Sequence, residues 1–202
     1  MKHINNLKMT QKTTLLLVIL ALFSTTLFSQ NEKETDSFKP SGKPFAKIYT
    51  NFHTDFTDGT TFSQFQLTRA YLGYQYTFSK HFSAKATLDF GNPGTGKLEM
   101  IAFIKYAYVS YQNKGLKVQF GLIGTSMFKL QEDIWGNRFM YKSFQDEYGF
   151  GSSADLGVSV AYEFNKFIAA DASILNGYGY KKVENDSVLK YTAGVTITPI
   201  KN

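Results

Sequence analysis

The stretch Ser83–Gly91, SAKATLDFG, decides the fold class of this chain. Its apolar positions are Ala84, Ala86, Leu88 and Phe90, and its polar positions are Lys85, Thr87 and Asp89. Successive side chains of a β-strand point to opposite faces of a sheet. One face of this segment therefore suits lipid and the other suits water, which is the pattern of a transmembrane β-barrel strand.

Similar segments recur along the chain and predict about eight antiparallel strands. We expect them at residues 45–56, 64–78, 83–91, 101–112, 116–122, 156–164, 167–175 and 189–198. The apolar positions 65 and 67 are out of phase with positions 70 and 72, which predicts a β-bulge near Thr68. The facing of the fourth segment is left open by its pattern.

The connections between these segments differ in length in an ordered way. Short turns are expected at 79–81, 113–115 and 165–166, and longer loops at the other end of the strands, with the Asp58-Gly59 hairpin as an exception. Outer-membrane barrels have this asymmetry. Alternation disappears over residues 125–153, and we interpret this long segment as a functional loop.

Three segments make up the predicted organisation of the chain. Residues 1–29 have the pattern of a signal peptide, with three lysines before an apolar run, and without these lysines the formal net charge falls from +6 to +3. We expect residues 30–43 to be a flexible periplasmic lead-in and residues 44–202 to form an outer-membrane barrel. No later run is apolar for about 18 residues, so membrane insertion would have to use strands.

Several kinds of chemistry are disfavoured by the sequence. The chain has no cysteine, which excludes disulfides, thiolate metal sites and an acylated cysteine anchor. The stretch 91–97, GNPGTGK, has the spacing of a phosphate-binding loop but is followed by Leu98 where that motif needs Ser or Thr. We therefore predict no enzyme activity, no cofactor, no metal site and no nucleic-acid partner.

Charged residues at the polar positions of the strands are the candidate pore-lining residues: Lys47, Arg69, Lys85, Asp89 and Lys117. A low-dielectric wall focuses the field of such charges, so the basic members could favour anions. Salt-bridge pairing between neighbouring strands is an equally good interpretation. The loop 125–153 adds Lys129, Arg138 and Lys142 as candidate constriction residues, but its four carboxylates outnumber them.

Three short stretches resemble a known family. RAYLGY at 69–74, AYVSY at 107–111 and VQFGLIG at 118–124 are similar to the N-terminal half of porins of the phosphate-selective porin O and P family, over about residues 62–199. The resemblance implies a barrel of about sixteen strands in the outer membrane, usually trimeric, with a loop folded into the lumen and lysines or arginines that guide anions. Small solutes would diffuse through it passively.

The chain departs from that family in having only about eight strands and in ending without an aromatic residue. We therefore expect a portion of a larger porin barrel, all-β in class. One alternative is a small closed barrel with a structural or adhesion role, in which the first strand pairs with the eighth. Another is a lipid hydrolase that uses His53 or His81, for which His53, Asp55 and Ser63 are the nearest candidate set. A soluble β-sandwich is the remaining competitor.

Overall fold

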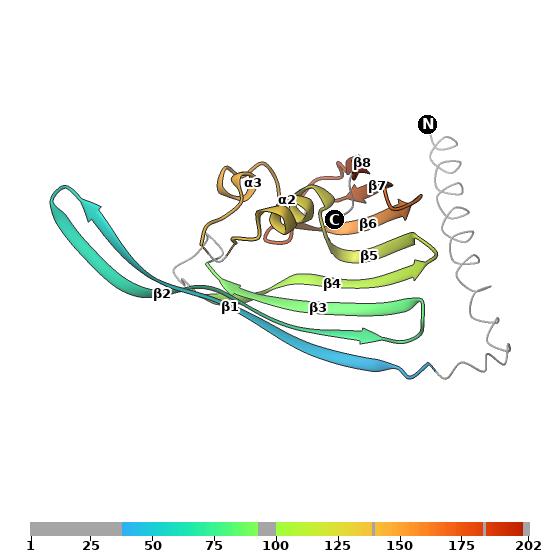
Figure 1. Ribbon diagram of the computed structural model, residues 1–202, viewed down its shortest axis with the longest axis horizontal. Helices are drawn as coiled ribbons and strands as arrows, with labels where there is room; N and C mark the ends of the chain where they lie inside the picture. The colour runs from blue at the N-terminus through green and yellow to red at the C-terminus, as the bar shows by residue number, and fades with distance from the viewer. Residues whose placement is uncertain (1–37, 93–99, 139, 184, 200–202) are drawn as a thin grey trace, which may run out of the picture. The chain divides into compact units, whose positions relative to one another are not determined.

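The computed structural model describes residues 38–92, 100–138, 140–183 and 185–199 (Figure 1). The chain divides into two compact units, residues 1–38 and residues 39–202. Almost all of the first unit, and with it the predicted signal peptide 1–29 and residues 30–37 of the lead-in, lies outside the described residues. The account below concerns the second unit.

A single antiparallel sheet forms this unit, and its eight strands follow one another in chain order (Figure 1). The strands are β1 (Ser41–Thr57), β2 (Thr60–Thr77), β3 (Phe82–Gly91), β4 (Ile101–Asn113), β5 (Leu116–Gly124), β6 (Ala154–Glu163), β7 (Ile168–Leu175) and β8 (Lys190–Ile197). The predicted number and antiparallel order of the strands are confirmed. The sheet begins at Ser41, which pairs with Thr77, so its first strand starts three residues before the predicted boundary at 44.

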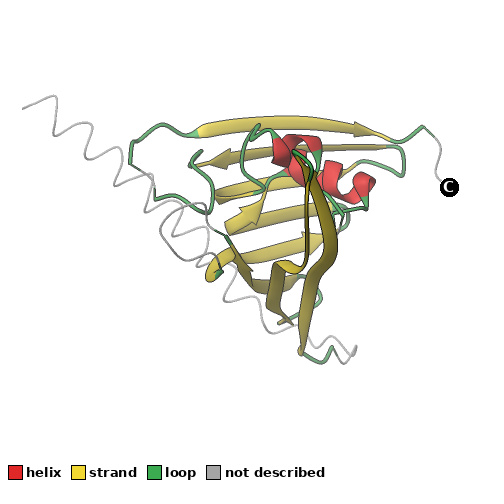
Figure 2. Ribbon diagram, turned by 90° about the vertical axis from the view of Figure 1, so that its left-hand side faces the viewer, coloured by secondary structure: helices red, strands yellow, loops and turns green. Residues whose placement is uncertain are grey.

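The segment 125–153, for which no strand was expected, contains two helices. They are α2 (Ser126–Trp135) and α3 (Phe144–Glu147). The first ends at Gly136, whose φ of 64° is the left-handed conformation that glycine adopts readily at a helix end. Both helices lie on the concave side of the sheet (Figure 2). We call the face of the sheet on this side the inner face and the opposite one the outer face.

Two irregularities in strand pairing set which side chains reach the inner face. In the β1–β2 pair, Tyr49 lies opposite Arg69 and Thr50 opposite Leu67, so Thr68 is the extra residue and the predicted bulge is confirmed. The Thr68 hydroxyl donates to the carbonyl of Tyr49 at 3.1 Å. This bulge brings both halves of β2 into phase with the same inner face.

A second bulge, which the sequence did not predict, lies in β4. Thr87 pairs with Tyr106 and Leu88 pairs with Ile104, so Lys105 is the extra residue. The shift explains why one alternation pattern could not describe this strand. It also settles the facing: Tyr106, like its partner Thr87, belongs to the inner face, and Ile104 belongs to the outer face with Leu88.

Two tight turns join neighbouring strands with the geometry that their sequences predict. Asp58 and Gly59 have φ values of 50° and 75°, and Lys114 and Gly115 have 43° and 87°. Two successive residues with positive φ are typical of the type I′ turn, whose twist matches that of a hairpin.

The sheet is apolar on its outer face and polar inside. Each strand exposes a large apolar side chain on the outer face, with exposed fractions from 38% at Leu88 to 70% at Phe120; the others are Ile48, Leu72, Val109, Val160, Ile174 and Val195. Among the described residues only four apolar side chains are buried, whereas seven polar or charged ones are. The described strands form one sheet, whereas a β-sandwich buries its apolar faces between two.

None of the helices in the described part of the chain is long and apolar enough to cross a membrane.

Candidate functional site

The five candidate pore-lining residues share the inner face. Directly opposite residues of neighbouring strands point to the same side of a sheet. Lys47 lies opposite Tyr71, which in turn lies opposite Asp89 on β3. Arg69 is two residues before Tyr71 on β2 and so points the same way.

Lys85 and Lys117 also lie on the inner face, as their cross-strand partners show. Lys85 lies opposite Gln75 on β2 and Tyr108 on β4. Lys117 lies opposite Gln112, four residues after Tyr108 on β4. The residues that the sequence singled out are therefore brought to one face, although they come from four different strands.

Four lysines of the inner face and α2 act electrostatically on one another. Lys47, Lys117 and Lys129 of α2 all act electrostatically on Lys85, and Lys129 also acts on Lys117. We call these four residues the lysine cluster. Glu163 acts on Lys117, and Asp133 pairs with Lys129 one helical turn away. Among the described residues no carboxylate lies within ion-pair distance of Lys47, Lys85 or Lys117, so the cluster carries an excess of positive charge.

Aromatic rings hold Lys85 in place. Its Nζ atom lies 4.8 Å from the ring centre of Phe45 on β1 and 5.6 Å from that of Tyr106 on β4. A cation over the face of an aromatic ring is attracted by the electrons of the ring. No carboxylate of the described residues lies within ion-pair distance of this ammonium group, so its charge is not neutralised by them.

Arg69 and Asp89, by contrast, neutralise each other. The Nε atom of Arg69 lies 3.1 Å from Oδ1 of Asp89, and the Asp89 side chain has no exposed surface. Tyr180, in the β7–β8 connection, donates its hydroxyl to Oδ2 of Asp89 at 3.2 Å. Arg69 and Asp89 are therefore arranged as a salt bridge between neighbouring strands, the alternative to a pore-lining role.

Lys105 is the functional candidate that the sequence missed. It is 5% exposed and donates to the Tyr71 hydroxyl at 3.1 Å. The rings of Tyr71, Tyr106 and Tyr180 surround its Nζ at 4.8, 5.6 and 5.8 Å. The signal that could have revealed it is the loss of phase between Ile104 and Tyr106, because the extra residue of a bulge is often turned toward a site.

The basic residues of the long connection are paired within it. Arg138 lies 3.0 Å from Asp146, and Lys142 lies 3.3 Å from Glu147. Lys129 pairs with Asp133 but also extends the lysine cluster. Of the three candidate constriction residues, Lys129 acts on Lys85 and Lys117, and Arg138 acts on Tyr71 of the inner face.

A row of small polar side chains crosses the whole inner face. Starting at Ser41, the cross-strand partners are Thr77, Ser83, Ser110, Gln119, Ser159, Ser173 and Thr192. The hydroxyls of Ser173 and Thr192 hydrogen-bond to each other. This row gives every strand a hydrogen-bonding group on the same side as the lysines.

The β7–β8 connection reaches back across the inner face. Asp155 accepts from the backbone N–H of Gly177 at 2.9 Å, which fixes the beginning of the connection on β6. Burial raises the pKa of the Tyr180 phenol, and the neighbouring Asp89 carboxylate raises it further, so the phenol stays protonated as a donor. Lys181 lies over the ring of Phe103 at 5.3 Å, and burial lowers its pKa.

The residues of the hydrolase alternative are not arranged as a triad. His53 lies 3.4 Å from Asp55, and the side-chain amide of Gln64 donates to its Nε2 atom at 3.1 Å. Ser63 pairs with Thr54, one residue along, and therefore projects from the opposite face to His53. His81 lies in the β2–β3 turn, where its Nδ1 is 2.9 Å from the carbonyl of Gln112.

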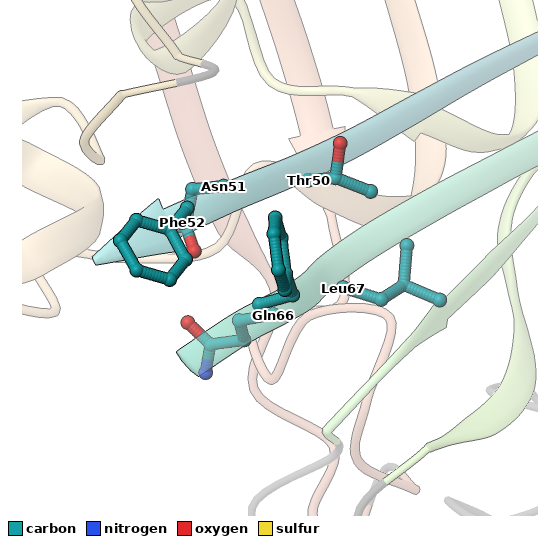
Figure 3. A pocket seen from close by; sticks show the side chains of 6 residues that line it. Thr50, Asn51, Phe52, Gln66 and Leu67 are labelled. Carbon is teal, nitrogen blue, oxygen red and sulfur yellow. The ribbon is translucent and has the colours of Figure 1, made fainter. Parts of the chain in front are cut away.

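A shallow hollow of about 530 Å³ lies beside the Thr68 bulge (Figure 3). Its walls are Thr50, Asn51, Phe52, Phe65, Gln66 and Leu67. The two phenylalanine rings pack with their centres 4.9 Å apart. None of these side chains titrates near neutral pH.

The remaining motifs give no site in the described part of the chain. Within it, no three His, Asp or Glu side chains gather as a metal site requires. Residues 93–97 of the loop with phosphate-binding spacing lie outside the described residues, and its first residue, Gly91, ends β3.

No family model matches this chain, and neither a curated protein nor a solved structure matches it.

Proposed function

We propose that this chain forms the wall of a porin-like channel in the outer membrane, through which small solutes diffuse passively with a preference for anions such as phosphate. The outer face would contact lipid, and the inner face would line the lumen. The observation that carries the proposal is the inversion of polarity: apolar side chains are exposed on every strand, while charged and hydroxyl side chains occupy the concave side.

Energetics support this assignment of the two faces. A monomeric soluble protein rarely exposes a continuous apolar patch larger than a few hundred Å², and here the apolar surface crosses all eight strands. Strands can cross a bilayer only if every backbone group is hydrogen-bonded, as in a closed barrel. The sheet would therefore be part of such a wall.

The lysine cluster supports the anion preference. Its four ammonium groups repel one another, and an anion that enters the lumen reduces this repulsion. Lys85 and Lys117 come from the sheet and Lys129 from α2, so the solute would meet basic side chains of both elements. No bond is made or broken in such passage.

Reversal potentials across planar bilayers test the proposal. We expect the purified protein to conduct, and the double variant Lys85→Gln/Lys117→Gln to lose several-fold in its chloride-to-potassium permeability ratio. The matched control is Lys114→Gln/Lys166→Gln, which removes the same charge from two short turns and should leave the ratio unchanged. An unaltered ratio in the first variant would eliminate the anion preference. A protein that stays monodisperse without detergent would eliminate the channel itself.

A further inference from the structure

The β7–β8 connection sends two side chains across the inner face, at the end of the sheet where the long loops lie. The Tyr180 hydroxyl donates to Oδ2 of Asp89 on β3 at 3.2 Å. The Nζ atom of Lys181 donates to the carbonyl of Asn92, just after β3, at 3.4 Å. Three strands, β4, β5 and β6, lie between β3 and β7 in the sheet. The connection and these two side chains therefore bridge the inner face over several strands.

The backbone that carries these side chains is fixed to β6. The N–H of Gly177 donates to the Asp155 carboxylate at 2.9 Å, and that of Tyr180 donates to the carbonyl of Ala154 at 3.0 Å. Within the described residues, no backbone group of 177–182 is hydrogen-bonded to the backbone of β3 or β4. The connection is thus anchored on one side by its backbone and on the other by side chains.

Release of the Tyr180 side chain leaves no unpaired charge behind. Asp89 keeps its ion pair with Arg69, whose Nε atom lies 3.1 Å from the other carboxylate oxygen. The freed phenol can donate to water, and a hydrogen bond exchanged for one to water costs far less than a polar group left unpaired. The bond between Tyr180 and Asp89 can therefore break and form again while the sheet stays intact.

In the observed arrangement Tyr180 covers Lys105. Lys105 is 5% exposed, and its Nζ atom lies 5.8 Å from the ring centre of Tyr180. The two other rings around this ammonium group, those of Tyr71 and Tyr106, belong to the strands β2 and β4. Tyr180 is the one of the three that comes from a connection. Moving its side chain would open Lys105 to the inner side of the sheet.

We propose that Tyr180 and Lys181 form a gate at the long-loop end of the lumen. In the closed state Tyr180 is bound to Asp89 and covers Lys105, and Lys181 lies over the ring of Phe103 at 5.3 Å. In the open state both side chains swing away from β3, the lumen widens, and the Lys105 ammonium group contacts a solute anion directly. This inference rests on the proposed function, because it describes how passage through the channel is regulated.

Chemical labelling of Lys105 tests the gate. Trinitrobenzenesulfonate, an amine-reactive anion, is applied to the protein in detergent micelles, and labelled peptides are quantified by mass spectrometry. Lys114, exposed in the β4–β5 turn, is the internal reference. Loss of a hydrogen bond to a charged group shifts an equilibrium roughly tenfold, so we expect Lys105 to be labelled about ten times faster in Tyr180→Phe. Lys181→Gln should also accelerate this reaction, while leaving the bond to Asp89 in place.

Tyr178→Phe is the matched control. The Tyr178 hydroxyl donates to Asp186 within the same connection at 2.9 Å. This variant removes the same group two residues away and should leave the labelling rate of Lys105 unchanged. Equal rates in Tyr180→Phe and Tyr178→Phe, with strands intact by circular dichroism, would overturn the gate. So would a Tyr180→Ala variant in which Lys105 is labelled no faster than in the unmodified protein, because the ring would then not be what covers the amine.

Reversal potentials give a second test. Tyr180→Ala should raise the chloride-to-potassium permeability ratio several-fold, and Lys105→Gln in the same background should cancel the increase. A ratio that Tyr180→Ala leaves unchanged would contradict a gate that exposes Lys105. Labelling separates the gate from the channel. Fast labelling in a Tyr180 variant that does not conduct would overturn only the channel, whereas a conducting protein whose Lys105 rate is independent of Tyr180 would overturn only the gate.

Discussion

Arg69 on β2 and Asp89 on β3 form an ion pair across the inner face, with Nε and Oδ1 3.1 Å apart. The carboxylate has no exposed surface, and the hydroxyl of Tyr180 occupies its second oxygen. The pair therefore ties the β7–β8 connection to the middle of the sheet. The positive charge that remains on this face comes mainly from lysines.

Removing the carboxylate of this pair should cost stability. In Asp89→Asn the guanidinium of Arg69 stays largely buried without its counter-charge, and losing one partner of a buried pair typically costs about 3 kcal/mol. Urea unfolding in detergent, followed by circular dichroism, measures the change. Tyr180→Phe, which removes only the hydrogen bond to Asp89, is the control and should cost less. An equal loss of unfolding free energy in the two variants would show that the ion pair adds nothing beyond the hydrogen bond.

Replacing the buried Lys105 by an apolar residue should not destabilise the folded protein. Within the described residues no carboxylate lies within ion-pair distance of its ammonium group, which contacts a tyrosine hydroxyl and aromatic rings. Exchanging a buried charge for a well-packed apolar side chain is often neutral or stabilising. We expect Lys105→Met to unfold at the same or a higher urea concentration. A loss of more than about 2 kcal/mol would show that the charge itself is needed.

Gly121 on β5 should tolerate no side chain. Its φ is 120°, and a Cβ atom would lie 2.4 Å from the backbone carbonyl oxygen of Ala107. Backbone cannot move aside as a flexible side chain can, so we expect Gly121→Ala to lower the free energy of unfolding by about 2 kcal/mol or more. Ser159→Ala, at an inner-face position of neighbouring β6, is the matched control. Its effect should stay below about 1 kcal/mol.

Lys181 should lose its proton at a lower pH than an ordinary lysine. Burial disfavours the charged form of the amine and lowers its pKa. Folding therefore disfavours the charged amine relative to the unfolded chain, and this destabilisation is relieved as the pH rises through the folded pKa toward the unfolded one. Acylation mapped by mass spectrometry across a pH series should give an earlier midpoint for Lys181 than for a lysine in an unfolded peptide. Equal acylation midpoints for Lys181 and the peptide lysine would show that burial does not lower the pKa of Lys181.

Local alternation in the sequence was enough to predict most of the sheet. The side-chain period of two gives the strands, and the change of phase around Thr68 gives the bulge. The resulting parity also places Lys47, Lys85 and Lys117 on the same side, because a register that keeps one face apolar leaves no other choice. These features depend only on neighbours along the chain and on adjacent strands.

What the tertiary structure decided is which charges meet. The sequence could not show that Arg69 is neutralised by Asp89, because either residue could equally have faced another strand. Nor could it show that Lys129 of α2 approaches Lys85, or that Tyr180 reaches Asp89, since these contacts join segments 44 and 91 residues apart. Alternation determines the face of the sheet on which a residue lies. Folding of the loops over that face determines its partner, and so whether its charge is cancelled or left unpaired.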